Sequence, residues 1–221
     1  MLFRNRQDAA EKLAHALIRW KGKRPLVYAI PRGAVPMGRI IADRLDGELD
    51  VVLTRKLHAP GNPEFAVGAV DETGWVYLAG YAAQVGATPD YMKRQVAAET
   101  ETIRARRAQY TPGRSPPDPR GRVVIVVDDG LATGATMVAA LHALRARNPQ
   151  ELVCAVPVAS VEALALVRGY ADEVVCLEAP EGFYAVGQFY LDFRQVEDSE
   201  VIALLRRPSA AAGGADSPGT P

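Results

Sequence analysis

The stretch VVIVVDDGLATGATM, residues 123–137, decides the fold because three kinds of sequence follow one another in it. Five β-favouring residues, 123–127, lead into two adjacent carboxylates, Asp128 and Asp129. A loop of small, glycine-containing residues comes next, and residues 136–147 are compatible with a helix. The stretch therefore predicts a strand, a ligand-binding loop and a helix in succession.

The predicted loop has the chemistry of a phosphate site. The N-terminus of a helix presents unpaired N–H groups and a partial positive charge, which together attract anions. In this loop the glycines can expose successive amides, the threonines can add hydroxyl donors, and the alanines leave room for a ligand. The residues expected to bind the phosphate are Gly130, Leu131, Ala132, Thr133, Gly134, Ala135 and Thr136.

Asp128 and Asp129, the acidic pair, cannot bind that phosphate because two carboxylates would repel it. Carboxylates readily accept hydrogen bonds from a vicinal diol, and they also approach bound cations. A phosphate loop beside an acidic pair therefore suits a sugar phosphate. The alternative that the residues leave open is an ordinary strand-to-helix turn with a solvated acidic pair.

Residues 123–137 are neither a Walker loop, which needs Gly-Lys-Ser/Thr, nor a dinucleotide-binding fingerprint, which needs Gly-x-Gly-x-x-Gly. The whole stretch instead resembles the 5-phosphoribosyl-1-pyrophosphate (PRPP) loop of type I phosphoribosyltransferases. The resemblance implies that the acidic pair holds the ribose hydroxyls and that the loop amides hold the 5-phosphate. The loop lacks the hydroxyl-rich variants of the purine enzymes, which points to an outlying branch of the family.

Composition limits the class of protein. The 221 residues, 48% hydrophobic and 24% charged, suit one globular domain with small appendages. Lysine plus arginine equal aspartate plus glutamate at 26 each, so the net charge gives no argument for nucleic acid or an anionic membrane as partner. No segment reaches the roughly 18 to 20 apolar residues of a membrane span, and no signal-peptide core follows the N-terminus. We expect a cytoplasmic protein.

Strand-like and helix-like segments alternate along the chain, which predicts an α/β fold with an open, mostly parallel twisted sheet and helices on both faces. The expected strands are 26–30, 50–53, 123–127, 152–158 and 173–177. We expect a single domain over 1–207 with a hood from about 1–20 and 179–207, an insertion at about 63–118 that holds a β-hairpin and a helix, and a disordered tail at 208–221. Cys154 and Cys176 are expected to be packing thiols without a disulfide.

The leaving pyrophosphate of PRPP requires donors that stabilise its developing charge. Pro31-Arg32-Gly33 resembles the family's first pyrophosphate loop, and the resemblance predicts a cis peptide bond between Pro31 and Arg32. Arg55 and Lys56 resemble the start of the mobile catalytic loop, where a basic pair closes on the pyrophosphate. The alternative for Arg55 and Lys56 is that this basic pair caps the end of a strand in solvent.

Residues 179–193 resemble the purine-binding hood segment of the hypoxanthine-guanine branch. The resemblance implies that Phe183 or Tyr184 stacks on the base and that Asp192 helps to hold the metal pyrophosphate. One-residue shifts on either side of Gly187 distinguish this chain from the branch. The alternative is that these aromatic side chains form the core of the hood.

The resemblance as a whole implies a Mg²⁺-dependent phosphoribosyltransferase in which a nitrogen nucleophile, a purine or another nucleobase, displaces pyrophosphate. Asp128, Asp129 and Lys56 are the expected catalytic residues. The Mg²⁺ would be held mostly by substrate and water, so no protein ligand is assigned to it. The expected partners are PRPP and a small acceptor, without nucleic acid or membrane, in a possible homodimer. The alternatives are a non-catalytic PRPP or nucleotide-binding regulator, and a sugar-phosphate hydrolase on the same scaffold.

Overall fold

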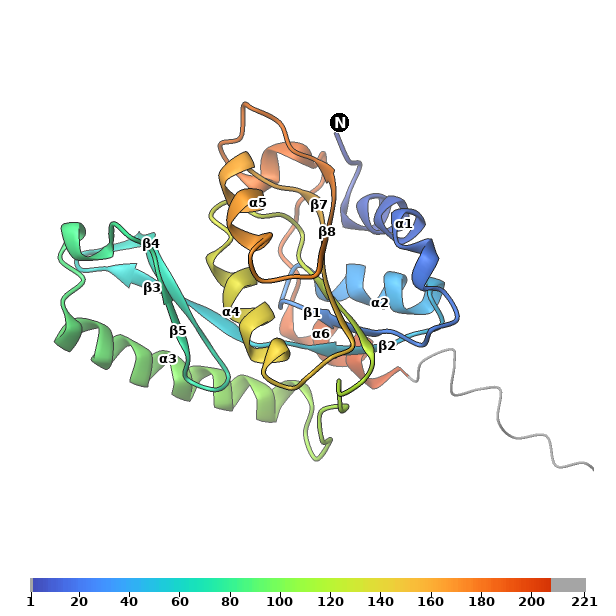
Figure 1. The fold of residues 1–221 in the computed structure, drawn as a ribbon, viewed down its shortest axis with the longest axis horizontal. Coiled ribbons are helices and arrows are strands. Elements are labelled where there is room, and N and C mark those ends of the chain that lie inside the picture. Colours follow the sequence, from blue (N-terminus) through green and yellow to red (C-terminus); the bar gives the residue numbers. More distant parts are fainter. Residues whose placement is uncertain (1, 208–221) are drawn as a thin grey trace, which may run out of the picture.

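A parallel five-stranded sheet forms the centre of the computed structural model, which describes residues 2–207 (Figure 1). The strand order is β2-β1-β6-β7-β8, and every neighbouring pair is parallel. The strands are β1 (Leu26–Ala29), β2 (Glu48–Val51), β6 (Val123–Val127), β7 (Glu151–Val158) and β8 (Glu173–Glu178). The order confirms the predicted fold class.

Helices cover both faces of this sheet. The helices α1 (Arg6–Ala16) and α2 (Val35–Arg44) pack on one face, and α4 (Ala135–Arg145) and α5 (Val161–Val167) pack on the other. Successive residues of β6 alternate between the two cores: Ile125 packs with the α1 and α2 residues, whereas Val124 and Val126 pack with α4. Because both faces are covered, β6 is apolar at all five positions and completely buried.

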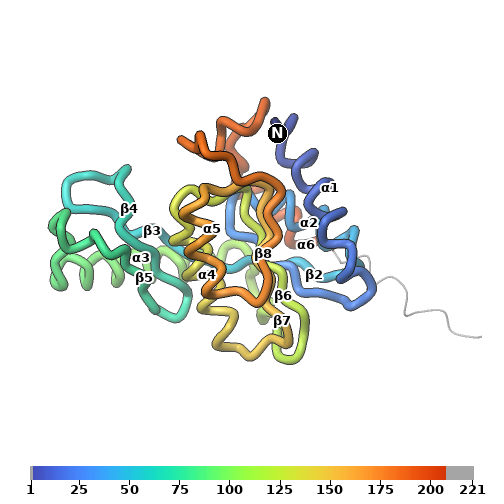
Figure 2. Tube along the Cα trace, turned by 45° about the horizontal axis from the view of Figure 1, so that its top comes forward, coloured from blue at the N-terminus to red at the C-terminus, as the bar shows by residue number. Residues whose placement is uncertain are grey.

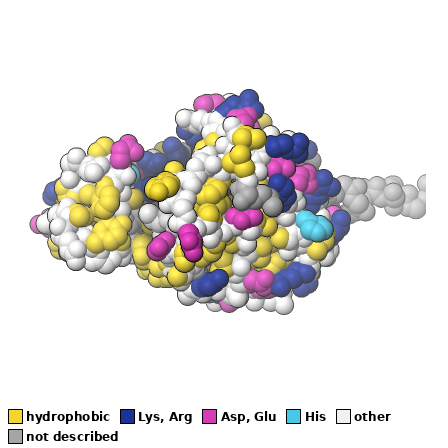
Figure 3. Space-filling model, turned by 90° about the horizontal axis from the view of Figure 1, so that it is seen from above, with side chains coloured by type: hydrophobic (Ala, Val, Ile, Leu, Met, Phe, Trp, Pro, Cys, Tyr) yellow, Lys and Arg dark blue, Asp and Glu magenta, His cyan; other side chains and the backbone are white. Residues whose placement is uncertain are grey.

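A second, antiparallel sheet and a long helix form a lobe beside the main sheet (Figures 1 and 2). Its strands, in the order β3-β4-β5, are β3 (Thr54–Ala59), β4 (Asn62–Asp71) and β5 (Val76–Leu78), and its helix is α3 (Pro89–Tyr110). The predicted hairpin is confirmed by the pairing of β4 with β5. The strand β3 is not among the predicted strands, and it contains Arg55 and Lys56, which resemble the start of a mobile loop. In the space-filling view a notch separates this lobe from the main body (Figure 3).

The remaining segments connect and close these layers. The helix α6 (Asp198–Arg206) packs against α2 and α3. Short 3-10 helices are η1 (Ile18–Trp20), η2 (Ala82–Val85) and η3 (Val186–Phe189).

Both cysteines are free thiols, with Cys154 buried and Cys176 partly buried. The predicted tail at 208–221 lies outside the described residues. Within residues 2–207, no helix is long and apolar enough to span a membrane.

Local sequence explains where the helices begin. Asn5 accepts a hydrogen bond from the Asp8 amide at 2.9 Å, and Thr88 caps α3 by accepting from the Tyr91 amide. Pro89 then occupies the first position of α3, where its missing N–H costs nothing. Asn and Thr are both preferred N-cap residues, so both helix starts follow from local sequence. The helix α1 ends at Ala16, and Leu17 and Trp20 are buried beyond its end, Trp20 within η1.

A buried aspartate fastens the lobe to α4. Asp71, which is fully buried at the end of β4, accepts hydrogen bonds from the Thr73 amide, the Thr73 hydroxyl and the Trp75 amide. Its other oxygen lies 3.3 Å from Nδ1 of His142 on α4, and the Trp75 ring stacks on His142 with centroids 3.8 Å apart. The turn between β4 and β5 is therefore tied to the helix that starts at the 130–136 loop.

We predict that Asp71→Ala lowers the free energy of unfolding by roughly 2 to 3 kcal/mol, because it removes the buried acceptor shared by the Thr73 and Trp75 donors and the contact with His142. Urea unfolding followed by circular dichroism would measure the change. Glu101→Ala is the control, since the Glu101 carboxylate is exposed and, within residues 2–207, is paired only with Arg104 across one turn of α3. Equal stability of the Asp71 variant and the wild-type protein would contradict this account of the docking.

Candidate functional site

A cavity of about 400 Å³ lies where the loops after β1 and β6 meet. Both loops leave the carboxyl ends of adjacent parallel strands, which is where open α/β sheets bind ligands. The predicted site residues that line this cavity are Arg32, Gly33, Lys56, Asp128, Asp129, Gly130, Leu131, Ala132, Thr133, Gly134 and Thr136. The predicted site residues that do not line it are Arg55, Ala135, Phe183, Tyr184 and Asp192.

Asp128 lies in the wall of this cavity, directly after β6. Burial raises the pKa of its carboxyl well above the ordinary value, and the neighbouring Asp129 charge raises that pKa further. The Asp129 amide donates to Oδ1 of Asp128 at 2.9 Å, which fixes the carboxyl group. The cavity thus holds an oriented carboxyl group whose ionised form is costly in the free protein.

Asp129 is held by Arg6, a residue 123 positions away in sequence. The Nε atom of Arg6 donates to Oδ2 of Asp129 at 2.9 Å, and Nη2 lies 2.8 Å from the same oxygen. The guanidinium also donates to the Arg194 carbonyl and lies 3.9 Å from the centre of the Phe193 ring. Burial raises the pKa of Asp129, whereas Arg6 acts to lower it. Arg6 therefore favours the ionised form of this carboxyl group.

Sequence reasoning missed Arg6 and the aromatic residues around it. One signal was present: Arg6 is the first residue of α1, where the helix dipole disfavours a cation. Tyr190 donates from its hydroxyl to the Asp129 carbonyl at 2.6 Å, and burial raises the pKa of this hydroxyl. Phe193 stacks on Tyr190 with ring centroids 4.9 Å apart. The C-terminal segment thus supports the acidic pair through backbone and ring contacts.

The 130–136 loop is shaped by close packing. A Cβ added at Gly130 would lie 2.6 Å from a methyl group of Val186, so no larger residue fits without movement. Gly134 has a φ of +78° and caps α4, whose first-turn amides have no partner within the helix. The Ser160 hydroxyl donates to the Ala132 carbonyl at 2.8 Å. The loop therefore presents helix amides from a fixed backbone, as an anion site requires.

The loop after β1 packs directly against the acidic pair. The peptide bond between Pro31 and Arg32 is cis, which confirms the sequence prediction. A Cβ added at Gly33 would lie 2.1 Å from Oδ2 of Asp129, so only glycine fits there. Arg32 points toward the start of α6, with Nη1 3.9 Å from Oδ1 of Asp198. Asp198 also accepts a hydrogen bond from the Tyr110 hydroxyl at 2.5 Å.

The side chains of Arg55 and Lys56, which are neighbours on β3, point to opposite faces of the strand. Lys56 lines the cavity, and its charge acts to lower the pKa of both members of the acidic pair. Arg55 instead donates from Nε to Glu99 on α3 at 2.6 Å. Successive residues of a strand point to opposite faces, so a strand cannot direct both cations to one site. Arg55 therefore lies outside the cavity in this structure, and its contact with pyrophosphate stays a prediction.

The hood residues predicted to bind substrate also lie outside the cavity. Asp192 pairs with Arg194, with Oδ2 3.0 Å from Nη2, and the geometry gives it no contact with the acidic pair. The Phe183 ring packs on Phe189 with centroids 5.2 Å apart, and Tyr184 is 92% exposed. A neighbouring arginine thus holds the Asp192 carboxylate at the surface, and its role toward a metal pyrophosphate stays a prediction. Ala135, Phe183 and Tyr184 line a second, adjacent cavity.

We predict that Asp128→Asn raises the free energy of unfolding at neutral pH by roughly 1 to 2 kcal/mol, because it removes a buried charge and keeps the amide hydrogen bond. The raised pKa means that the native state binds more protons than the unfolded state between the ordinary carboxyl pKa, about 4, and the raised pKa. The free energy of unfolding of the wild-type protein therefore falls as pH rises between these two values. The gain should therefore shrink toward pH 4. Thermal unfolding across pH would test it, and a loss of stability at every pH would contradict it.

Arg6→Gln should have the opposite effect, lowering the free energy of unfolding at neutral pH by roughly 2 to 4 kcal/mol, because it leaves the Asp129 carboxylate without its cation. The loss should grow as pH rises, since Arg6 lowers the pKa of Asp129. The added substitution Asp129→Asn should recover part of the stability. Arg4→Gln is the control, because the Arg4 side chain is 80% exposed. A loss independent of pH would refute the electrostatic role.

The amino-acid sequence of the chain is similar to that of a known protein family. The sequence profile described as the phosphoribosyl transferase domain matches residues 2–194. A protein of Mycobacterium tuberculosis strain H37Rv, named "Putative phosphoribosyl transferase", is 39% identical over 227 residues, which cover 100% of this chain and 51% of that protein. The correspondingly named protein of strain CDC 1551 / Oshkosh gives the same values. The chain thus spans about half the length of these curated relatives.

A solved structure extends the similarity to the backbone. The crystal structure of the protein TT1426 from Thermus thermophilus is 46% identical in sequence and superposes with a TM-score of 0.77. The superposition covers 93% of this chain and 98% of that chain. Since the family profile spans most of the chain and a relative aligned over all of it is 39% identical, the chain belongs to the phosphoribosyl transferase domain family.

Proposed function

We propose that this protein transfers the 5-phosphoribosyl group of PRPP to a nitrogen nucleophile, with pyrophosphate as the leaving group. One observation carries the proposal: the acidic pair, the 130–136 loop and two cationic side chains, Arg32 and Lys56, line a single cavity of about 400 Å³. A sugar that bears phosphates on both sides needs these three kinds of contact together.

The loop and the acidic pair would hold the ribose 5-phosphate. The amides at the start of α4, which have no acceptor within the helix, suit the phosphate, and the hydroxyls of Thr133 and Thr136 can add donors. Ionised Asp128 and Asp129 would accept hydrogen bonds from the two ribose hydroxyls. Those bonds favour the charged carboxylates and would offset the cost of burying them. Ligand binding would thereby favour the form of the acidic pair that the free protein disfavours.

Arg32 and Lys56 would stabilise the pyrophosphate as it leaves. The bond between C1 and the pyrophosphate oxygen breaks while the acceptor nitrogen forms its bond to C1, so negative charge grows on the leaving group. Lys56 is exposed at the edge of the cavity and can move toward that charge. Gly33 keeps the loop after β1 close enough for its backbone to approach the same position.

The cavity fits a Mg²⁺ ion that is held mainly by the substrate. Oxygen ligands suit this cation, and the acidic pair supplies carboxylates whose charges would be offset by it. Among the described residues, however, no three of the His, Cys, Asp and Glu side chains cluster as a complete metal site. Mg²⁺ would supply charge neutralisation to the pyrophosphate, with its other ligands coming from PRPP and water.

Several finer features stay predictions. These are a purine or another nucleobase as acceptor, a homodimer, a cytoplasmic location, and the division of the chain into hood, insertion and core. The rival function, a regulator that binds PRPP or a nucleotide without turnover, has the same contacts and differs in its lack of product. The experiment must therefore separate binding from catalysis.

Calorimetric titration with PRPP and Mg²⁺, followed by an assay of pyrophosphate release with a panel of nucleobases, tests the proposal. We expect micromolar PRPP affinity, base-dependent release, and loss of both when Mg²⁺ is removed with a chelator. The double variant Asp128→Asn, Asp129→Asn should lose PRPP affinity at least about 100-fold while remaining folded.

Asp172→Asn is the matched control, because this carboxylate lies outside the cavity and pairs with Arg145. It should bind PRPP as the wild-type protein does. Tight binding without pyrophosphate release for any acceptor would favour the regulator, whereas unchanged PRPP affinity in the double variant would refute the site assignment.

A further inference from the structure

Arg32, the cation in the loop after β1, contacts a carboxylate that lies outside the cavity. Its Nη1 atom is 3.9 Å from Oδ1 of Asp198, the first residue of α6, and the guanidinium has no other ion pair within residues 2–207. The contact follows from the fold, because α6 packs against α2, which begins directly after this loop. An element outside the cavity therefore reaches a cation that is proposed to meet the pyrophosphate.

A buried tyrosine holds the Asp198 carboxylate in place. Tyr110 is 1% exposed, and its hydroxyl donates to Oδ1 of Asp198 at 2.5 Å. Burial, followed by this hydrogen bond, raises the pKa of Tyr110 to about 12, whereas the charge of Arg32 acts to lower it. The hydroxyl therefore stays protonated at neutral pH and remains a donor. The helix dipole at the start of α6 also favours the negative charge of Asp198.

These contacts connect the lobe with the loop after β1. Tyr110 is the last residue of α3, which runs from the lobe toward the main body (Figure 1). An earlier turn of the same helix carries Glu99, the partner of Arg55 on β3. Asp198 then joins the end of α3 to Arg32, which lines the cavity. The three side chains are far apart in sequence, so only the packing of α3, α6 and α2 brings them together.

Arg32 can keep its contact with Asp198 and still face the cavity. A guanidinium carries five N–H donors in a planar fork, so one edge can meet a carboxylate while the other N–H groups meet an anion. An unpaired arginine samples many rotamers and loses that freedom when it binds, so a partner that restrains it lowers the cost of binding. The Asp198 side chain is 37% exposed, and water therefore weakens its repulsion of a bound pyrophosphate.

We infer that Asp198 and Tyr110 are positioning residues of the proposed transferase: Tyr110 fixes the Asp198 carboxylate, and Asp198 orients the Arg32 guanidinium toward the leaving pyrophosphate. The inference rests on the proposed phosphoribosyl transfer and assigns two further residues to that same site. Neither residue lines the cavity, so both act through Arg32. Their effect is therefore confined to ligands that carry pyrophosphate.

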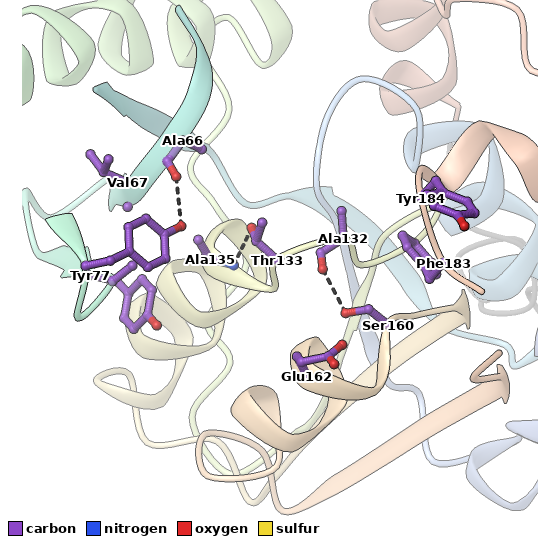
Figure 4. Close-up of a pocket in the computed structure, with 13 residues that line it drawn as sticks. Ala66, Val67, Tyr77, Ala132, Thr133, Ala135, Ser160, Glu162, Phe183 and Tyr184 are labelled. Carbon is purple, nitrogen blue, oxygen red and sulfur yellow. Dashed lines mark hydrogen bonds between the residues drawn. The ribbon is translucent and has the colours of Figure 1, made fainter. Parts of the chain in front are cut away.

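The two ends of PRPP supply the test, because only the pyrophosphate end is proposed to meet Arg32. The 5-phosphate is proposed to bind the 130–136 loop, which is held by contacts of its own, such as that from the Ser160 hydroxyl to the Ala132 carbonyl (Figure 4). Within the described part of the chain, neither positioning residue has a hydrogen bond or ion pair to this loop. Ribose 5-phosphate, which lacks the pyrophosphate, therefore reports on the loop alone.

Calorimetric titration of the full chain with PRPP and with ribose 5-phosphate, both with Mg²⁺, would measure the effect. Asp198→Asn should raise the PRPP Kd about fivefold or more, and Tyr110→Phe about threefold or more, with the ribose 5-phosphate Kd changed less than about twofold. Both substitutions nearly keep the size of the side chain. Glu200→Gln is the matched control, because Glu200 is an exposed carboxylate in the first turn of α6 that does not line the cavity. It should bind both ligands as the wild-type protein does.

A double-mutant cycle with Arg32→Gln separates positioning from a structural role. Because Asp198 acts through Arg32, Asp198→Asn should change the PRPP Kd less than about twofold in the Arg32→Gln background. A residue that only stabilised the packing of α3 against α6 would lower PRPP affinity in both backgrounds. It would also lower the affinity for ribose 5-phosphate.

The outcomes separate this inference from the proposed function. Absence of PRPP binding by the wild-type protein would refute phosphoribosyl transfer and, with it, both positioning roles. With PRPP bound by the wild-type protein, an unchanged PRPP Kd for Asp198→Asn, equal losses for the two ligands, or an equal effect with and without Arg32→Gln would each overturn the inference. A lower PRPP Kd would also overturn it, because the Asp198 charge would then only repel pyrophosphate. Losses confined to PRPP and absent in the Arg32→Gln background would support it.

Discussion

Two adjacent carboxylates at the end of a buried strand impose the strongest constraint on this structure. Ionised Asp128 and Asp129 repel each other in a poorly solvated cavity, and burial raises the pKa of both. Arg6 and Lys56 offset part of that cost, and they come from segments before and after β1. The N-terminal helix and the lobe must therefore both be in place for the acidic pair to be charged and oriented.

The same constraint explains why so many contacts converge on Asp129. Gly33 leaves space for its carboxylate, Arg6 binds one of its oxygens, and Tyr190 binds its carbonyl. A residue restrained at both its carboxylate and its backbone has little freedom to lose when it meets a ligand, so binding is preorganised. The cost of this arrangement is electrostatic strain in the free protein, which is typical of functional sites.

The lobe adds residues to the site that the main parallel sheet does not supply, among them Lys56 on β3. Docking through Asp71, Trp75 and His142 fixes β4 and β5 against α4, the helix that begins at the 130–136 loop. This contact positions Lys56 at one cavity and Tyr77 at the next. The fold thus places the cation that faces the proposed pyrophosphate on the small antiparallel sheet, outside the main parallel one.

The sequence by itself determined the α/β architecture, the loop at residues 130–136 and the helix starts at Asn5 and Thr88, because each depends on neighbouring residues and periodicity. The Pro31–Arg32 cis bond followed only from the resemblance to the family's first pyrophosphate loop. Only the tertiary structure brought Arg6 to Asp129, turned Arg55 away to Glu99 and placed Asp198 beside Arg32. Pattern and spacing specify local backbone, whereas a partner more than 40 positions away is chosen by how the layers pack, which a sequence pattern does not encode.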